Sequence, residues 1–291
     1  MDKLGLLQHI FPELCSLKGI EDETSEMLLD IPNTIKEGVR IGGLFLPVQK
    51  EKTQQIATCL NSTNLGLKDL EIGAYYYTTS RYFHNIDDYQ SKIRFVKKAI
   101  SLQKKYPLAL KKSLLLLGIF YGKSGNFVKS IETYRELLKV GEEEYFHGRA
   151  YQQLAIIFKG LGDFEKALEY IDKAILIFNK EEKTEKLIEV YNEKAFTYRE
   201  MNSLVNEVNI FKTLQESEAS ISLLNDENKK LKYQSTINHL KGNLYYRKKE
   251  YQKAKTFLQK ALHSSQKIQN FKRVNEIKND LGLIYFRFKN Y

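Results

Sequence analysis

The sequence predicts an all-α fold, in which antiparallel helix pairs stack as an α-solenoid. A small residue recurs every 37 to 47 residues, at Ser80, Gly118, Ala155, Ala195, Gly242 and Gly282. An aromatic residue follows each of them by three positions, at Phe83, Tyr121, Phe158, Tyr198, Tyr245 and Tyr285. Three of the four prolines lie in the first 47 residues. Because proline breaks helix interiors, the later chain can be almost continuous helix and tight turn.

Each repeat predicts a helical hairpin, built in the same order. The small residue lets a second helix approach helix A, and the aromatic residue fills the space one turn on. Turn-forming or polar pairs such as Gly125-Asn126 and Gly162-Asp163 then end helix A. An apolar residue nine positions after the small residue begins helix B, at Tyr89, Phe127, Phe164, Leu204, Tyr251 and Tyr291. Nineteen positions after it, helix B packs back on helix A through Ala99, Leu137, Ala174, Leu214 and Ala261.

The chain divides into two predicted parts. Residues 1–70 hold prolines and the glycine-rich run EGVRIGGLFLP, and are expected to form an irregular helical segment. Residues 71–291 are expected to form the array, with about five full repeats and one half repeat. A polar insertion, NDENKK at Asn225 to Lys230, lengthens the fourth interval. Since Tyr291 stands where the sixth helix B would begin, the sequence predicts a truncated chain.

Composition favours a folded soluble protein in a reducing compartment, and we expect a cytoplasmic location. Hydrophobic residues make up 42% and charged residues 28%. No run reaches the roughly 20 apolar residues needed to span a bilayer, and the N-terminus lacks a secretion signal. The two cysteines form no redox or metal motif. The net charge of +10 favours anionic partners, although the lysines alternate with glutamates and form no dense basic arm.

No arrangement of residues typical of catalysis is present. Gly42-Gly43 lack the lysine-serine pair of a phosphate loop, and there is no GxSxG elbow. The five histidines show no metal-ligand spacing such as HExxH. The sequence therefore predicts a binding protein that is not an enzyme, with no metal and no cofactor.

The array resembles the tetratricopeptide repeat family, most closely in AYQQLAIIFKGLGDFEKALEYIDKAILIF and INHLKGNLYYRKKEYQKAKTFLQKAL. The resemblance covers residues 73 to 291 and implies a right-handed superhelix. It departs from the family in its longer period, in lacking the family's tryptophan, and in lacking its closing proline except at Pro107.

The resemblance implies that helix A of each repeat lines an inner groove. The expected ligand-binding residues are Tyr77, Arg81, Gln152, Lys159, Asn192, Arg199, His239, Asn243, Tyr246 and Asn279. Further positions of the same groove are Ile156, Phe196, Leu283 and Phe286. Amides can pair with a peptide backbone, and cations can hold a carboxylate.

Within this family, the long period and the tyrosine- and asparagine-rich helices are similar to the Rap, NprR, PlcR and PrgX group. These are peptide-sensing regulators of Gram-positive bacteria and their phages. The resemblance implies a bacterial intracellular receptor that binds a short signalling peptide in quorum sensing. Such a receptor could also form a homodimer. The groove lacks the lysine-asparagine pattern that binds chaperone C-termini, and residues 1–70 do not read as a DNA-binding helix-turn-helix. A scaffold or adaptor in complex assembly, and a nucleic-acid-binding regulator, remain as alternatives.

Overall fold

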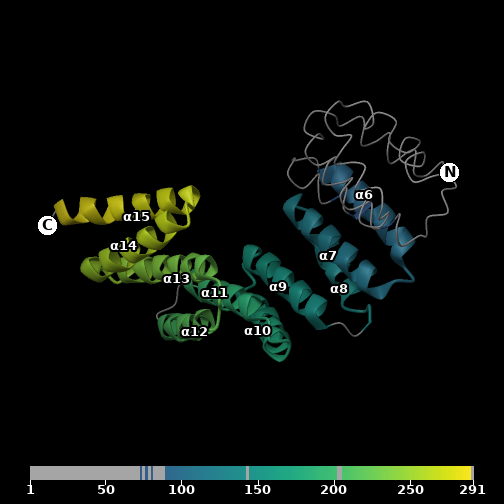
Figure 1. Cartoon of the computed structure of the whole chain (residues 1–291), viewed down its shortest axis with the longest axis horizontal. Coiled ribbons are helices and arrows are strands. Elements are labelled where there is room, and N and C mark those ends of the chain that lie inside the picture. The colour runs from purple at the N-terminus through teal and green to yellow at the C-terminus, as the bar shows by residue number, and fades with distance from the viewer. Residues whose placement is uncertain are drawn as a thin grey trace. The chain divides into compact units, whose positions relative to one another are not determined.

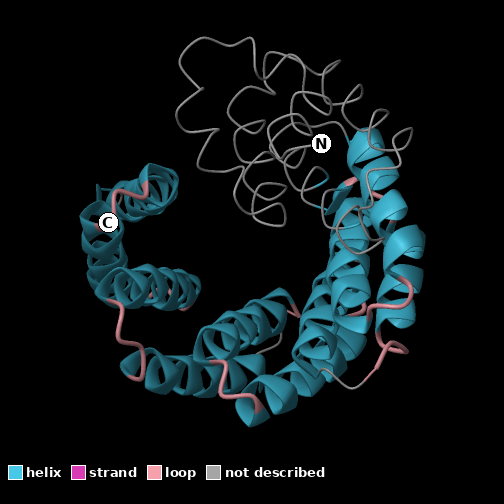
Figure 2. Ribbon diagram, turned by 45° about the vertical axis from the view of Figure 1, so that its right-hand side comes forward, coloured by secondary structure: helices cyan, strands magenta, loops and turns pink. Residues whose placement is uncertain are grey.

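The structure is a computed structural model that describes residues 73, 76, 77, 80, 89–141, 144–201 and 205–289. Within these residues the chain is helical and contains no strand (Figure 2). The prediction of an all-α helical repeat fold is confirmed. The expected irregular segment 1–70, and with it the boundary at residue 70, lies outside the described residues.

The chain forms two compact units, Met1–Phe146 and His147–Tyr291 (Figure 1). In the first unit, α6 packs on α7 and α7 on α8; in the second, the pairs α11·α12 and α13·α14 share the most contacts. The helices are α6 (Tyr89–Gln103), α7 (Pro107–Lys123), α8 (Phe127–Leu137), α9 (Glu144–Gly160), α10 (Phe164–Lys180), α11 (Thr184–Glu200), α12 (Val205–Ser222), α13 (Glu227–Arg247), α14 (Tyr251–Lys267) and α15 (Phe271–Lys289).

Four helices begin at the residue predicted from the repeat: Tyr89, Phe127, Phe164 and Tyr251. The other two predicted starts, Leu204 and Tyr291, lie outside the described residues, and α12 is described from Val205. Side chains of Asn126, Asp163, Asp226 and Asn270 accept hydrogen bonds from backbone N–H groups three residues on, which caps α8, α10, α13 and α15.

The turn between helices A and B requires a left-handed residue. Gly125 and Gly162 have φ of 80° and 81°, and the equivalent Lys249 has φ of 62°. The backbone N–H of Lys249 donates to the carbonyl oxygen of Tyr246 at 3.0 Å, so the same turn forms without glycine. Lysine in this conformation carries a steric cost that glycine avoids.

We expect Lys249→Gly to stabilise the second unit by about 0.5–1 kcal/mol, because strain relief exceeds the entropy gained by the unfolded chain. Urea denaturation of both proteins measures the change. As a control, Lys260→Gly on the exposed side of α14 should cost about 1 kcal/mol through lost helix propensity. A loss of stability in Lys249→Gly would contradict the argument.

The recurring small residues sit at close approaches between helices A and B. A Cβ added at Gly118 would enter the ring of Tyr134 on α8, and one added at Gly242 would lie 2.7 Å from the Leu258 side chain on α14. Ala155 and Ala195 are fully buried. Gly282 differs, because it is exposed and a Cβ there would meet no heavy atom within 4 Å. No described helix packs on this point of α15.

The remaining repeat positions form the packing between the helices of each pair. All five residues predicted nineteen positions after the small one are fully buried: Ala99, Leu137, Ala174, Leu214 and Ala261. The ring of Phe158 stacks on Tyr170 at 5.5 Å, and the equivalent Tyr245 stacks on Phe257 at 5.3 Å. Tyr285, at the same position of α15, is exposed. The repeat therefore predicts the hairpin core closely up to α14.

Two features of the fold were not predicted from the sequence. The polar insertion lies at the start of α13, where Asp226 caps a helix of 21 residues. Lys92 and Lys111 are fully buried. The Lys92 ammonium lies 4.1 Å from the centre of the Tyr89 ring, which provides a favourable cation–π contact.

Candidate functional site

The candidate site lies on helices α9, α11, α13 and α15 of the second unit, the A helices of successive hairpins. Helix α13 contacts both α11 and α15. Because each A helix repeats the same pattern, residues at equivalent positions lie on equivalent faces of successive helices.

A half-buried aromatic ring on α11 marks the first part of the site. The Lys159 ammonium lies 5.8 Å from the centre of the Phe196 ring, and the Arg199 guanidinium lies 4.9 Å from it. Lys159 Nζ also pairs with Glu193 Oε1 at 2.6 Å. From α13, Arg247 Nη1 donates to the backbone carbonyl oxygen of Arg199 at 3.2 Å. We call these four residues, Lys159, Phe196, Arg199 and Arg247, the cation–aromatic cluster.

The cluster places positive charge beside an apolar surface. Burial lowers the pKa of Arg199, and the neighbouring charge of Arg247 acts in the same direction, whereas Glu200, 3.9 Å from Arg199 Nη2, and Asp280 oppose the shift. The guanidinium stays charged all the same, because its ordinary pKa is so high. Arginine side chains can form charge-assisted hydrogen bonds with a carboxylate, so Arg199 and Arg247 are suited to a ligand that carries one.

A second part of the site is a polar knot centred on Glu189 of α11. Glu189 Oε2 accepts from Lys186 Nζ at 2.7 Å and from Gln152 Nε2 of α9 at 3.3 Å. Its Oε1 accepts from the Tyr233 hydroxyl of α13 at 3.4 Å. One carboxylate thus links three successive A helices. Burial and the charges of Glu189 and Glu185 raise the pKa of Tyr233, so it remains a hydrogen-bond donor.

The Glu189 knot gives the second unit a pH-dependent contribution to stability. Burial alone would raise the pKa of Glu189, but the hydrogen bond and charge of Lys186, with Gln152 and Arg149, outweigh it and lower the pKa below 4.5. A carboxyl whose pKa is lowered by folding stabilises above its unfolded pKa, and loses that effect as the pH falls through its folded pKa. We expect Glu189→Gln to remove this part of the acid destabilisation below pH 4.5, measured by urea denaturation across pH. An unchanged pH profile would contradict it.

The third part joins α13 to α15. His239 Nε2 lies 2.6 Å from Asp280 Oδ2, and His239 Nδ1 lies 3.3 Å from Arg273 Nη1. Arg273 also pairs with Glu276 at 3.1 Å. This chain of side chains holds the predicted groove residue His239 between two helices.

The predicted site residues fall into different environments. Asn192 is only 6% exposed, and its Oδ1 accepts from Ser217 Oγ of α12 at 3.1 Å, so this amide serves the hairpin interior. Gln152 is buried in the Glu189 knot, with Oε1 lacking a hydrogen-bond partner among the described residues. Asn243 and Tyr246 are half-buried, Asn279 is exposed, and Tyr77 of the first unit is half-buried. Arg81 lies outside the described residues.

Apolar residues at groove positions remain open to solvent. Ile156 is 40% exposed, Leu283 54% and Phe286 62%. Exposed large side chains at equivalent positions of α9 and α15 are typical of a binding surface. The acidic partners Glu189, Glu193 and Asp280 were not predicted, because their roles depend on contacts between helices some 40 residues apart in sequence.

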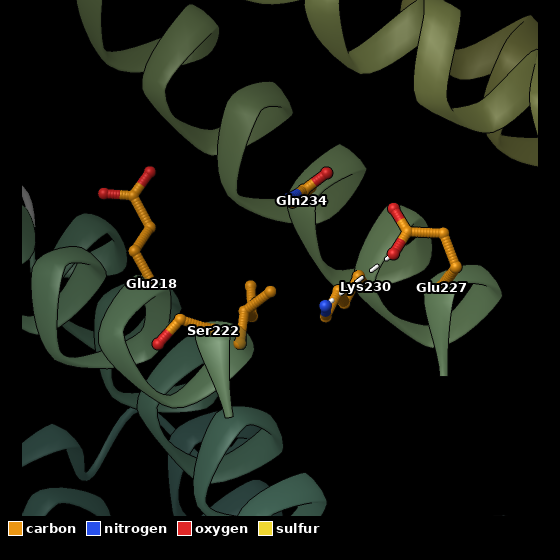
Figure 3. A pocket seen from close by; sticks show the side chains of 6 residues that line it. Glu218, Ser222, Glu227, Lys230 and Gln234 are labelled. Carbon is orange, nitrogen blue, oxygen red and sulfur yellow. Dashed lines mark ion pairs between the residues drawn. The ribbon is translucent and has the colours of Figure 1, made fainter. Parts of the chain in front are cut away.

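A separate cleft of about 510 Å³ lies between α12 and α13 (Figure 3). Its walls are Glu218, Ile221 and Ser222 from α12, with Glu227, Lys230 and Gln234 from α13. Lys230 pairs with Glu227 at 3.7 Å across one edge, and Glu218 pairs with Lys241 at 2.7 Å. The polar insertion builds one wall of this cleft, which the sequence did not predict as a site.

The described residues contain neither a metal centre nor a membrane-spanning helix. No group of three or more histidine, cysteine, aspartate or glutamate residues suited to a metal ion occurs among the described residues. None of the described helices has the length and apolarity needed to span a membrane.

Comparison with solved structures shows the fold. BtubC (BKLC) from P. vanneervenii matches with a TM-score of 0.58 and 16% identity, over 87% of this chain and 93% of that one. Aspartyl phosphate phosphatase F from Bacillus subtilis matches with a TM-score of 0.59 and 12% identity, over 97% and 80%. The apo form of RapI matches with a TM-score of 0.56 and 10% identity, over 88% and 99%.

Comparison of sequences identifies the repeat. No curated protein matches the chain. The model of the tetratricopeptide repeat family matches residues 148–181 and 235–267, which cover most of the α9–α10 hairpin and the later part of α13 with α14. The resemblance predicted from the small and aromatic residues is thereby confirmed. The chain matches the tetratricopeptide repeat in these two segments, and the solved structures show the same helical repeat fold.

Proposed function

We propose that the second unit is a receptor for a short peptide, bound across α9, α11 and α13 at the cation–aromatic cluster. The observation that carries the proposal is the half-exposed Phe196 ring, with the Lys159 and Arg199 cations 5.8 Å and 4.9 Å from its centre and Arg247 reaching Arg199 from the next A helix. In keeping with the resemblance to peptide-sensing regulators, we place this receptor in the bacterial cytoplasm, acting in signalling without catalysis.

The cluster favours a peptide with an apolar side chain next to a carboxylate. A ring flanked by cations offers an apolar surface, while the arginines can form charge-assisted hydrogen bonds with a carboxylate. Ile156 on α9 supplies a further exposed apolar contact one turn from Lys159. The C-terminal carboxylate of a short peptide, or an aspartate or glutamate beside an apolar residue, has the required chemistry.

The fold similarity to aspartyl phosphate phosphatase F and RapI supports the proposal, because it extends over most of the chain. The polar knot supports it in a different way. Glu189 and its partners link the three A helices next to the cluster, which would hold the binding surface in one geometry before the ligand arrives.

The proposal is tested by isothermal titration of the purified chain with a panel of five- to ten-residue peptides that end in an apolar residue and a free carboxylate. We expect Arg199→Ala to weaken binding about 10- to 100-fold, because a desolvated charge-assisted hydrogen bond is lost. Amidation of the peptide's C-terminus should weaken binding of the wild type to a similar extent.

The matched control is Lys173→Ala on α10, which removes an exposed cation paired with Glu169 and should leave affinity unchanged. Equal losses in both variants would indicate general charge attraction and overturn the assigned site. If no peptide in the panel binds, and none changes the unfolding temperature of the chain, the receptor function is overturned.

A scaffold role is the second candidate, and the exposed apolar residues of α15 favour it. Leu283 and Phe286 on this helix are open in the described structure. A stable stoichiometric protein partner recovered with the chain, retained by Arg199→Ala, would support the scaffold and not the peptide receptor.

A further inference from the structure

We propose that helices α6 and α7 of the first unit bind an acidic segment of a partner protein, in which the acidic residues flank an apolar one. The surface consists of one exposed leucine and five exposed cations: Leu108, Arg94, Lys97, Lys104, Lys105 and Lys112. We call these six residues the basic edge. They belong to the first unit, so the proposal is independent of the peptide receptor proposed for the second.

The charged residues of α6 and α7 are all positive. From Tyr89 to Lys123 the sequence holds nine lysines and arginines and no aspartate or glutamate. The remainder of the chain is nearly balanced, with 37 basic and 36 acidic residues. These two helices therefore account for most of the net charge of +10. A surface with charges of one sign attracts a partner of the opposite sign and orients it.

Lysines on the equivalent B helices of the second unit have acidic partners close by in the sequence. On α10, Lys173 Nζ lies 2.5 Å from Glu169 Oε1, and on α14, Lys253 Nζ lies 2.6 Å from Glu250 Oε2. Helix α6 contains no acidic residue, so it has no such pairs. None of the five cations of the basic edge forms an ion pair with another described residue. Their charges remain available to a partner.

The helices hold these cations on a packed framework. Arg94 and Lys97 are three residues apart and exposed, while Val96 on the other face of α6 is buried in a cluster with α7. Lys104 and Lys105 follow in the turn that leads into α7. Figure 1 shows α6 lying against α7. A surface on two packed helices needs little ordering when a partner binds.

Leu108 favours a protein segment over a nucleic acid. Its side chain is 44% exposed, three residues after Lys105 and four before Lys112. An exposed apolar side chain among cations suits a peptide with an apolar residue between acidic ones, whereas a phosphate backbone offers it little. Proteins that bind single-stranded nucleic acid also stack bases on aromatic rings, and no aromatic residue of α6 or α7 is exposed.

Two designed peptides test the proposal by fluorescence anisotropy with the full chain. The first has about twelve residues, with glutamates on both sides of a central leucine, and a C-terminal amide. The second has glutamine in place of every glutamate. We expect the glutamate peptide to bind at least about tenfold more tightly than the glutamine peptide at low salt, and its affinity to fall as salt is added.

Two triple variants locate the binding. The first replaces three cations of the basic edge: Arg94→Gln, Lys97→Gln and Lys104→Gln. It should weaken binding of the glutamate peptide at least about tenfold, because three attractive charges are lost. The control changes the net charge equally at three exposed lysines of the second unit: Lys212→Gln, Lys232→Gln and Lys267→Gln. It should retain the affinity, and both variants should keep the wild-type unfolding temperature because all six positions are exposed.

Two single variants test the chemistry and the place of the site. Leu108→Ala should weaken binding of the glutamate peptide about two- to fivefold, because part of an apolar contact is lost. Arg199→Ala, in the cation–aromatic cluster, should leave this binding unchanged. The same measurements with a DNA duplex of about 20 base pairs at about 150 mM salt test a nucleic acid as the occupant.

Four results would overturn the proposal. Equal affinity for both peptides, or no binding of either, would remove the acidic specificity. Equal losses in the two triple variants would indicate general charge attraction. Loss of binding in Arg199→Ala would place the peptide in the second unit. Tighter binding of the DNA than of the glutamate peptide, lost in the first triple variant and retained by Leu108→Ala, would identify a nucleic acid as the occupant.

Discussion

Gly242→Val is expected to lower the free energy of unfolding of the second unit by about 2–3 kcal/mol. The added Cβ would lie 2.7 Å from Cγ and Cδ2 of Leu258 and 3.4 Å from the backbone oxygen of Ala254. Leu258 is fully buried, and side chains in a packed interior have little room to move. Helix α13 would have to shift away from α14, which weakens the largest contact between helices in this unit. Urea denaturation followed by far-ultraviolet circular dichroism measures the loss.

Gly282→Val is the matched control, because it places the same side chain at the same repeat position. No heavy atom lies within 4 Å of the added Cβ, and we expect a change within about 0.5 kcal/mol. Losses of similar size at both glycines would show that valine acts through the helix backbone and not through packing. The two variants therefore distinguish the loss caused by a clash between packed helices from any change in helix propensity, at the same position of the repeat.

The hairpin core could be predicted because its positions repeat along the sequence. Four helices begin at the expected residues, Tyr89, Phe127, Phe164 and Tyr251. The five residues expected nineteen positions after each small residue are also buried: Ala99, Leu137, Ala174, Leu214 and Ala261. These features depend on residues fewer than 20 apart, within one hairpin. A local pattern that recurs six times is visible without any knowledge of the tertiary structure.

The site could be predicted only in part. The groove pattern identifies which face of each A helix to consider, but not which side chains are already engaged. Asn192 was expected to contact a ligand, yet it accepts a hydrogen bond from Ser217 inside its own hairpin. Glu189 was not singled out, although it bonds to residues 37 and 44 positions away. Such contacts depend on how successive hairpins pack, which a single-repeat pattern does not contain.

Phe178→Ala is expected to cost about 3–5 kcal/mol, because it removes a fully buried ring from the contact between α9 and α10. The ring lies beside Gly148, where an added Cβ would be 2.8 Å from Phe178 Cε1. Since glycine has no side chain to move into the space, the cavity cannot be filled from that side of α9. The loss is measured by urea denaturation, with the m-value reporting whether the second unit still unfolds as one cooperative body.

Leu176→Ala provides the control on the same helix. Leu176 is 72% exposed, so its truncation should change stability by no more than about 0.5 kcal/mol. Both substitutions place alanine, the best helix former, in α10, so neither loses helix propensity. A comparable loss in Leu176→Ala would mean that this exposed face of α10 is covered in solution. If only Phe178→Ala lowers the free energy of unfolding, the packing of α9 on α10 supplies that stability. This packing lies within the segment 148–181 that matches the tetratricopeptide repeat.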